Sequence, residues 1–290
     1  MKSLKPKINI NFTDFWPGFD KNNNYFTKIL ETKYDISISD NPDYLFYSCF
    51  GNDFLHYDCV RIFYTGENWR KPDFNVCDYA MGFDYLTLDD RYIRFPLYFL
   101  YTEDYMLAKK KHWISQKEIE QKASFCNFIY SNPQPYHRNL FFDLLSNYKK
   151  VDSGGRYRNN LGYSVENKLH FQRKYKFSIA FENDSSEGYT TEKIIQAFAA
   201  QTIPIYWGNP AIAKEFNPKS FINCHDFESF EEVVRKVKEI DNDPQLFRNM
   251  LKEPIYLEDV NQDEIGETQL LKFLSSIFDS NYDLAFRRPR

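Results

Sequence analysis

Residues 177–210 carry the strongest chemical signal in this sequence, because they read as strand, polar loop, helix and second strand. We predict that the helix opens at Thr190 or Thr191 and holds Glu192 and Lys193 in its first turn. A helix N-terminus offers free N–H groups and positive potential, which suit a phosphate, and a lysine there is unfavourable for the helix itself. We therefore expect an anionic ligand near Lys193, with Glu192 accepting hydrogen bonds from a ribose diol. An ordinary strand–helix–strand unit with exposed charges would give the same pattern.

An arginine upstream of that run is a second candidate for binding phosphate. Arg158 stands in the segment SGGRYRNN, after Gly154 and Gly155. A guanidinium group is planar and always charged, so it can bind two pyrophosphate oxygens at once. The glycines allow the backbone to approach a ligand closely. Arg156 is the competing choice, and a solvated surface arginine would look the same.

A single glutamate is the candidate for proton transfer. Glu67 follows a predicted strand and Gly66 in the segment FYTGENW. Ligands bind at the carboxyl ends of parallel strands, so this carboxylate is expected at a binding edge, where it could take a proton from an attacking hydroxyl. An ordinary surface carboxylate is the alternative.

Two series of alternating strands and helices position these residues. The predicted strands of the first series cover residues 7–11, 34–39, 43–50 and 59–64, and those of the second cover 124–130, 175–183, 202–210 and 219–227. Predicted helices include residues 24–32, 137–148, 190–201 and 229–240. Such alternation predicts parallel α/β sheets in two domains with a ligand cleft between them. We place the boundary between residues 117 and 118, with the C-terminal helices in the second domain.

Composition narrows the class of protein. A length of 290 residues suits one large or two ordinary domains, and a net charge of −4 argues against a nucleic-acid binder. The aromatic content of 19% is expected to serve mainly the core, with some rings left for stacking on sugars. Five cysteines without metal-like spacing indicate reduced thiols in a cytoplasmic protein. No apolar run is long enough for a membrane span, and the arginines near the C-terminus read as a solvated tail.

Several long motifs resemble the α-1,3/1,4-fucosyltransferases, glycosyltransferase family 10, typified by bacterial Lewis-antigen enzymes. The matching segments are FSIAFENDSSEGYTTEKII, TIPIYWGNP, FYTGENW, FNVCDYAMGFDYL, YIRFPLYFL, SNPQPYHRNLFFDLL, SGGRYRNNLGY and NPKSFINCHDF. They cover most of residues 59–230. The resemblance implies the GT-B architecture, α/β with two Rossmann-like domains facing across a cleft. Residues 1–117 would then bind the acceptor, and residues 118–290 would bind GDP-fucose.

The resemblance also implies roles for individual residues. Glu67 matches the general base of the family, and Arg158 matches its pyrophosphate-binding arginine. The nucleotide-sugar positions fall on Asn183, Tyr189, Glu192 and Lys193. The loop DSSEG departs from the family pattern and leaves the role of Glu187 open. Asp14, Phe15 and Trp16, in the loop after the first predicted strand, are candidates to line the acceptor site.

The implied reaction is an inverting transfer of L-fucose from GDP-β-L-fucose to a GlcNAc hydroxyl of N-acetyllactosamine or a related glycan. The α-1,3 and α-1,4 linkages both stay open, as do the acceptor and the oligomeric state. No cofactor is expected to be required, with Mn²⁺ or Mg²⁺ as optional activators. We expect a cytoplasmic location, with peripheral contact with the inner membrane as an option. Two alternatives are a GT-B transferase that uses another nucleotide sugar and a non-catalytic glycan-binding protein.

Overall fold

The computed structural model describes residues 5–257 and 265–289 of the chain, and their packing divides the chain into two units. The first unit combines residues 1–100 with residues 261–290, and the second comprises residues 101–260. This division corrects the predicted boundary at residues 117 and 118, since the last helices pack with the first unit. Each unit is an α/β structure with a parallel sheet, as the alternation of strands and helices predicted.

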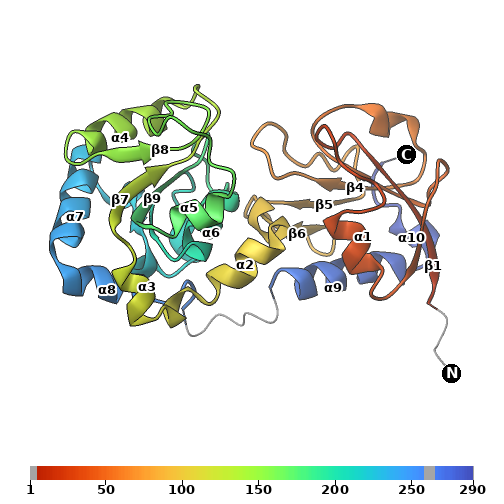
Figure 1. Ribbon diagram of the computed structural model, residues 1–290. Coiled ribbons are helices and arrows are strands. Elements are labelled where there is room, and N and C mark those ends of the chain that lie inside the picture. The colour runs from red at the N-terminus through yellow and green to blue at the C-terminus, as the bar shows by residue number, and fades with distance from the viewer. Residues whose placement is uncertain (1–4, 258–264, 290) are drawn as a thin grey trace. The chain divides into compact units, whose positions relative to one another are not determined.

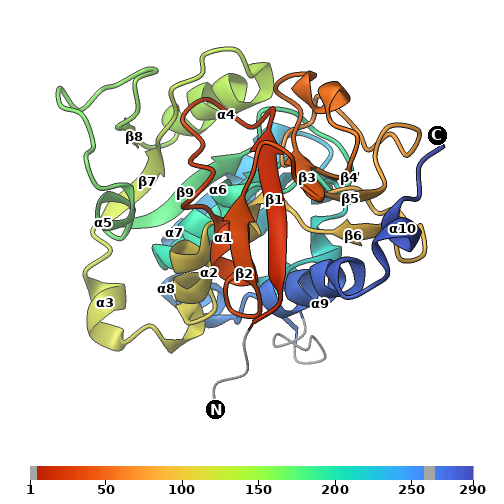
Figure 2. The same cartoon turned by 90° about the vertical axis from the view of Figure 1, so that its right-hand side faces the viewer.

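The first unit is built on a six-stranded parallel sheet in the order β2-β1-β3-β4-β5-β6 (Figure 2). Its strands are β1 (Lys7–Thr13), β2 (Asp35–Ile38), β3 (Tyr44–Tyr47), β4 (Val60–Tyr64), β5 (Tyr79–Gly82) and β6 (Tyr92–Arg94). Its helices are α1 (Tyr25–Leu30), α9 (Glu267–Phe278) and α10 (Tyr282–Ala285). All four residues of β3 are buried, which explains the continuous apolar run that marks this strand in the sequence.

Aromatic side chains form much of the core of the first unit. Phe12 stacks on Phe46 at a centroid distance of 5.1 Å, and Phe26 lies edge-on to Tyr64 at 5.2 Å. Helix α9 joins this core through Phe278, whose ring is 4.5 Å from that of Tyr44 and 5.6 Å from that of Tyr34. These contacts explain why the C-terminal helices belong to the first unit.

The basic C-terminal segment is fixed to the first unit, contrary to the prediction of a solvated tail. The backbone N–H groups of Arg287 and Arg288 donate to one oxygen of the fully buried Asp78, at 2.7 and 2.9 Å. The Arg288 guanidinium pairs with the same carboxylate, and that of Arg287 makes two 2.9 Å bonds to Asp90. A buried carboxylate needs such partners, so Asp78 holds this segment in place.

The second unit has a five-stranded parallel sheet in the order β11-β10-β9-β7-β8. Its strands are β7 (Ser124–Phe128), β8 (Val151–Ser153), β9 (Tyr175–Phe181), β10 (Ile203–Trp207) and β11 (Ile222–Asn223). Its helices are α2 (Thr102–Ala108), α3 (Gln116–Glu120), α4 (Tyr136–Ser146), α5 (Lys168–Gln172), α6 (Glu192–Ala199), α7 (Phe230–Asn242) and α8 (Pro244–Lys252). Figure 1 shows α4 and α7 on one side of this sheet and α6 on the other. Because all its strand pairs are parallel, the polar residues that follow the strands lie at one edge of the sheet. In the described ranges, no helix is both long and apolar enough to cross a membrane.

A buried lysine closes the end of α8 in the second unit. The Lys111 side chain is 0% exposed, and its ammonium group donates to the carbonyls of Met250, Leu251 and Glu253 at 3.3, 2.8 and 3.4 Å. The last carbonyls of a helix lack partners inside the helix, and a cation at this end is favourable. Lys111 therefore acts as the cap of α8.

Burial lowers the pKa of Lys111 to about 7, but its amino group donates to the carbonyls in either protonation state. We expect Lys111→Met to lower the free energy of unfolding by about 2–4 kcal/mol, because it leaves several buried carbonyls without their donor. Chemical denaturation monitored by circular dichroism measures this change. Lys110→Met is the matched control, since that neighbouring side chain is exposed. Equal stabilities of the two variants would contradict the capping role.

Candidate functional site

A buried glutamate organises the start of α6 in the second unit. Glu182 directly follows β9 and is fully buried. Its carboxylate accepts the backbone N–H of Thr191 at 2.7 Å and the Thr191 hydroxyl at 2.6 Å, and it lies 3.0 Å from the Lys193 ammonium group. Gly208 makes room for this side chain, because a Cβ at Gly208 would come within 2.4 Å of the Glu182 Cγ. Glu182 thus fixes the loop before α6 to the first turn of that helix.

Lys193 is the cation of this arrangement, as the sequence predicted for the first turn of the helix. Its ammonium group also lies 3.5 Å from the Glu192 carboxylate and donates to Thr191 Oγ1 at 2.8 Å. Burial opposes the charge, but Glu182 and Glu192 outweigh it and hold the pKa of Lys193 above its ordinary value. The side chains of Lys193 and Glu192 keep 13% and 19% of their area exposed, so the site is open to a ligand at the helix N-terminus.

The Glu192 carboxylate lies next to Lys193 at the N-terminus of α6 and carries a negative charge. Burial alone would raise the pKa of Glu192, but Lys193 and Lys168 stabilise its charged form, and the net pKa is lowered. Glu192 is therefore ionised at neutral pH and available as a hydrogen-bond acceptor for a polyol.

A buried arginine that the sequence reasoning missed holds Asn183. Arg138, in the first turn of α4, is 1% exposed. It donates to Asn183 Oδ1 at 3.0 Å and to the Asn132 carbonyl at 2.7 Å, and its guanidinium lies 3.9 Å from the centre of the Tyr130 ring. The signal was present in the sequence, because Arg138 is a cation in the first turn of a predicted helix, the same feature that marked Lys193. Asn183 is therefore oriented by Arg138.

The loop between Asn183 and α6 is also held internally. Tyr189 is only 2% exposed, and its carbonyl accepts from the Tyr206 hydroxyl at 3.4 Å. The Gly188 N–H donates to Asn209 Oδ1 at 2.8 Å. Glu187 forms an ion pair with Lys214 at 2.8 Å, and both side chains are more than half exposed. Glu187 thus lies on the surface, whereas Tyr189 is buried. Tyr189 is close enough to Lys193 to contribute to the raised pKa of that lysine.

Arg158 also lies in the second unit, but its ion-pair partner is not one of the two glutamates that pair with Lys193. Its guanidinium forms an ion pair with Asp143 of α4 and lies 5.3 Å from the centre of the Phe142 ring and 5.4 Å from that of Tyr157. Its backbone φ of 54° is in the left-handed region, which costs a non-glycine residue about 1–2 kcal/mol. Such strain persists where the surrounding structure imposes it, often at functional positions. Arg156, the competing choice, is exposed.

One glycine before Arg158 serves packing. A Cβ on Gly155 would lie 2.0 Å from the Tyr130 carbonyl oxygen. The Tyr157 N–H donates to that same carbonyl at 3.0 Å. We expected the glycines to bring the backbone close to a ligand, whereas Gly155 brings it close to the neighbouring segment.

Glu67 lies in the first unit, in the loop after β4, as predicted for the carboxyl end of a parallel strand. Its N–H donates to Thr65 Oγ1 at 3.1 Å, and the Thr65 hydroxyl donates to the Glu67 carbonyl at 2.9 Å. Burial raises the pKa of the Cys49 thiol, and the charge of Glu67 adds to this effect. The Glu67 carboxylate therefore lies near the loop that follows β3.

Asp14 anchors that loop. Its carboxylate accepts the N–H groups of Asp53 and Phe54 at 3.0 and 2.9 Å. Its two sequence neighbours belong to an aromatic cluster, in which Phe15 stacks on Phe19 at 4.2 Å and Trp16 lies 5.5 Å from Phe15. Asp14 thus has a structural role, while Phe15 and Trp16 lie in the loop after β1, at the same edge of the sheet as Glu67.

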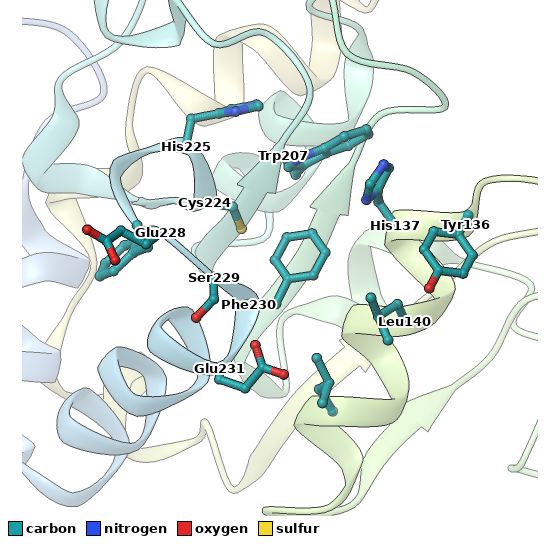
Figure 3. A pocket seen from close by; sticks show the side chains of 12 residues that line it. Tyr136, His137, Leu140, Trp207, Cys224, His225, Glu228, Ser229, Phe230 and Glu231 are labelled. Atoms are coloured by element: carbon teal, nitrogen blue, oxygen red, sulfur yellow. The ribbon is translucent and has the colours of Figure 1, made fainter.

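A hollow of about 400 Å³ lies where β10 and β11 end and α4 and α7 begin (Figure 3). Trp207 and His137 lie side by side in it, with ring centroids 4.7 Å apart, and Glu228 and Glu231 contribute carboxylates. None of the predicted site residues lines this hollow. Within residues 5–257 and 265–289, no group of three or more His, Cys, Asp and Glu side chains is arranged to hold a metal ion.

Comparison with protein families gives two adjacent matches. Residues 10–101 match the N-terminal domain of the FucT α-(1,3)-fucosyltransferases. Residues 119–253 match the C-terminal part of glycosyltransferase family 10, the fucosyltransferases. The second match contains Arg158, Asn183, Tyr189, Glu192 and Lys193, and the first contains Glu67.

Individual relatives agree with these matches. An α-(1,3)-fucosyltransferase of Helicobacter pylori is 40% identical over 262 residues, which span 78% of this chain and 55% of the relative. A putative fucosyltransferase of Acanthamoeba polyphaga mimivirus is 31% identical over 226 residues, 72% of this chain and 36% of the relative. The chain thus spans about half or less of the length of these curated relatives.

Solved structures show the same likeness. A crystal structure of an α1,3-fucosyltransferase with GDP-fucose matches with a TM-score of 0.84 and 31% identity, over 100% of this chain and 95% of that one. A complex of Anabaena HepE with UDP-glucose matches with a TM-score of 0.55 at 8% identity, which shows a common fold alone.

Proposed function

Because the chain belongs to glycosyltransferase family 10, the fucosyltransferases, we propose that it transfers L-fucose from GDP-fucose to a hydroxyl of a glycan acceptor. The observation that carries this proposal is the partly exposed pair of Lys193 and Glu192 at the N-terminus of α6, inside the segment that matches the family. Its geometry suits a phosphate next to a ribose, with Lys193 on the phosphate and Glu192 on the diol. The relative of known structure was crystallised with GDP-fucose, which supports the same donor.

The reaction follows from the stereochemistry of donor and product. Conversion of GDP-β-L-fucose to an α-linked product inverts the anomeric carbon, which one in-line displacement achieves. The acceptor oxygen forms the new bond to that carbon, the bond to the β-phosphate oxygen breaks, and GDP leaves with the electron pair. Glu67 takes the proton of the acceptor hydroxyl. Lys193, Arg158 and the N–H groups at the start of α6 stabilise the charge that develops on GDP.

These cationic groups can supply the charge stabilisation that metal ions supply in other transferases. We therefore propose that transfer proceeds without a required metal, with Mn²⁺ or Mg²⁺ as an optional activator. Activity measured after exhaustive treatment with EDTA tests this proposal. Complete loss of activity that is restored by one divalent ion would contradict it.

The acceptor is proposed to be N-acetyllactosamine or a related glycan, modified at a GlcNAc hydroxyl to give a Lewis-type product. GDP-fucose is supplied with N-acetyllactosamine and, separately, with its β-1,3-linked isomer, and the product linkage is read by NMR. Transfer to the first gives the α-1,3 linkage and transfer to the second the α-1,4 linkage. Parallel reactions with GDP-mannose and UDP-galactose test the alternative of another donor. Binding of acceptor without turnover of any donor would favour a glycan-binding protein.

Arg158→Ala is expected to weaken GDP binding about 10- to 100-fold, because a charge-assisted contact contributes about 1.5–3 kcal/mol. Isothermal titration calorimetry with GDP measures the affinity. The surface ion pair with Asp143 contributes little to folding, and alanine at this position has the same backbone preference as arginine, so thermal stability should change little. Arg156→Ala is the matched control, and equal affinities of the two variants would remove Arg158 from the donor site.

We also propose a cytoplasmic location, because all five cysteines are free thiols, four of them buried. Peripheral contact with the inner membrane and the oligomeric state are separate questions. Cell fractionation and light scattering of the purified protein answer them.

A further inference from the structure

An exposed tryptophan stands beside the proposed general base in the first unit. Trp69 is 67% exposed and follows Glu67 by two positions in the loop after β4. Single exposed apolar side chains are common on protein surfaces, so it is the place of Trp69 beside Glu67, and not its exposure alone, that suggests a role. Its ring rests against Phe50, at a centroid distance of 4.9 Å and an interplanar angle of 64°. The indole is therefore supported on one side and open to solvent over most of its area.

The loop that carries Trp69 is fastened on both sides of it. On one side, Thr65 makes two hydrogen bonds to the backbone of Glu67. On the other, the Arg70 guanidinium donates to the Gly51 carbonyl at 3.0 Å and lies 4.9 Å from the centre of the Phe54 ring. The position of Trp69 is thus set by its neighbours in the sequence.

The segment on which Trp69 rests is also fixed. The Phe50 N–H donates to the Asp14 carbonyl at 3.0 Å, and the Asp14 carboxylate accepts from Asp53 and Phe54. The same segment includes Cys49, whose thiol accepts from Thr65 at 3.7 Å and lies within the electrostatic influence of Glu67. The Trp69 ring therefore packs on the loop after β3, and the Glu67 carboxylate lies within electrostatic range of the same loop.

We propose that Trp69, supported by Phe50, is the stacking surface for a neutral hexopyranose ring of the acceptor. The inference rests on the proposed function, since it assigns the sugar next to the hydroxyl that Glu67 deprotonates. Pyranose rings present an apolar face of C–H groups, which packs on the face of an aromatic ring. A rigid platform next to the base would bind the acceptor equally in the ground state and the transition state, which lowers its KM. Because the ring carries no charge, it selects for shape and leaves the donor unaffected.

Trp69→Ala tests this proposal in a transfer assay with GDP-fucose and N-acetyllactosamine. We expect the acceptor KM to rise about three- to tenfold, while the donor KM and the kcat at saturating acceptor stay close to the wild type. Trp69→Phe keeps an aromatic face and should recover most of the loss, whereas Trp69→Leu, apolar without such a face, should not. Trp113→Ala is the matched control, because that ring is 70% exposed in the second unit.

Saturation-transfer NMR with N-acetyllactosamine provides a readout that does not depend on turnover. Wild type should show saturation of the sugar ring protons, and Trp69→Ala should show weaker saturation at the same acceptor concentration, with an unchanged thermal midpoint. If the wild type binds the disaccharide but transfers no fucose, the proposed function fails. The saturation measured in wild type and in Trp69→Ala then still tests whether Trp69 stacks on the sugar. An unchanged acceptor KM and unchanged saturation in Trp69→Ala would overturn the stacking role, as would an equal effect of Trp113→Ala.

Discussion

Replacing Glu67 by glutamine is expected to lower the rate of fucose transfer by about 10²–10⁴-fold and to leave the affinity for GDP unchanged. Glutamine preserves the size and hydrogen-bonding shape of the side chain but cannot accept a proton. The local backbone should persist, because Glu67 is held there through its N–H and carbonyl. Initial rates with GDP-fucose and acceptor measure the first effect, and calorimetry with GDP measures the second.

Two comparisons make this result specific to proton transfer. Glu67→Asp retains a carboxylate at a shorter reach and should keep part of the activity. A neutral acceptor hydroxyl needs the base, so the defect of Glu67→Gln should shrink as the pH is raised and solvent hydroxide competes. Turnover of Glu67→Gln close to that of the wild type would remove Glu67 from the mechanism, and an equal loss of GDP affinity would indicate a structural defect.

Local patterns in the sequence predicted the elements that carry the site. The continuous apolar run at residues 43–50 became β3, buried along its length. The helix that opens after Thr191 became α6. The helix predicted at residues 229–240 became α7 (Phe230–Asn242), which Ser229 caps by accepting the Glu232 N–H at 3.4 Å, while the Glu232 carboxylate accepts from the Glu228 N–H.

Elements set by distant contacts could not be predicted in this way. Strand β8 (Val151–Ser153) is too short to show a period and is not among the predicted strands. The packing of α9 depends on Phe278 meeting Tyr44, more than two hundred residues earlier in the chain. Helix α8 was missed for a different reason, because its signal is local: Asp243 caps it, directly before a proline in its first turn.

In the candidate site, too, local features could be predicted from the sequence and contacts between distant residues could not. The sequence placed Lys193 in the first turn of a helix, where it lies. It could not show that Lys193 pairs with the buried Glu182, or that Arg158 pairs with Asp143, because those partners come from other elements. The cap residue of α6 shows the consequence: Thr191 makes no side-chain cap bond, since its hydroxyl serves Glu182.

Removal of Lys193 is the second change with a large expected effect. Because Lys193 also neutralises the buried Glu182, the experiment needs a variant in which both residues are replaced. Lys193→Met alone strips a fully buried carboxylate of its cation, which costs about 3–5 kcal/mol of folding free energy. A fall in GDP affinity in that variant would therefore mix a binding defect with a damaged fold. The double variant Lys193→Met with Glu182→Gln removes both charges together, and it should recover much of the lost thermal stability.

In the double variant, GDP affinity should still be about 10- to 100-fold weaker than in the wild type, because the ligand phosphate has lost a charged donor. The single variant Glu182→Gln keeps Lys193 beside Glu192 but removes the carboxylate that competes with the GDP phosphate for the lysine. This variant should therefore bind GDP as well as the wild type or better. Calorimetry and thermal denaturation of all three variants separate the two roles. Wild-type affinity in the double variant would show that Lys193 serves only to neutralise Glu182, and that the phosphate is held by other groups at the start of α6.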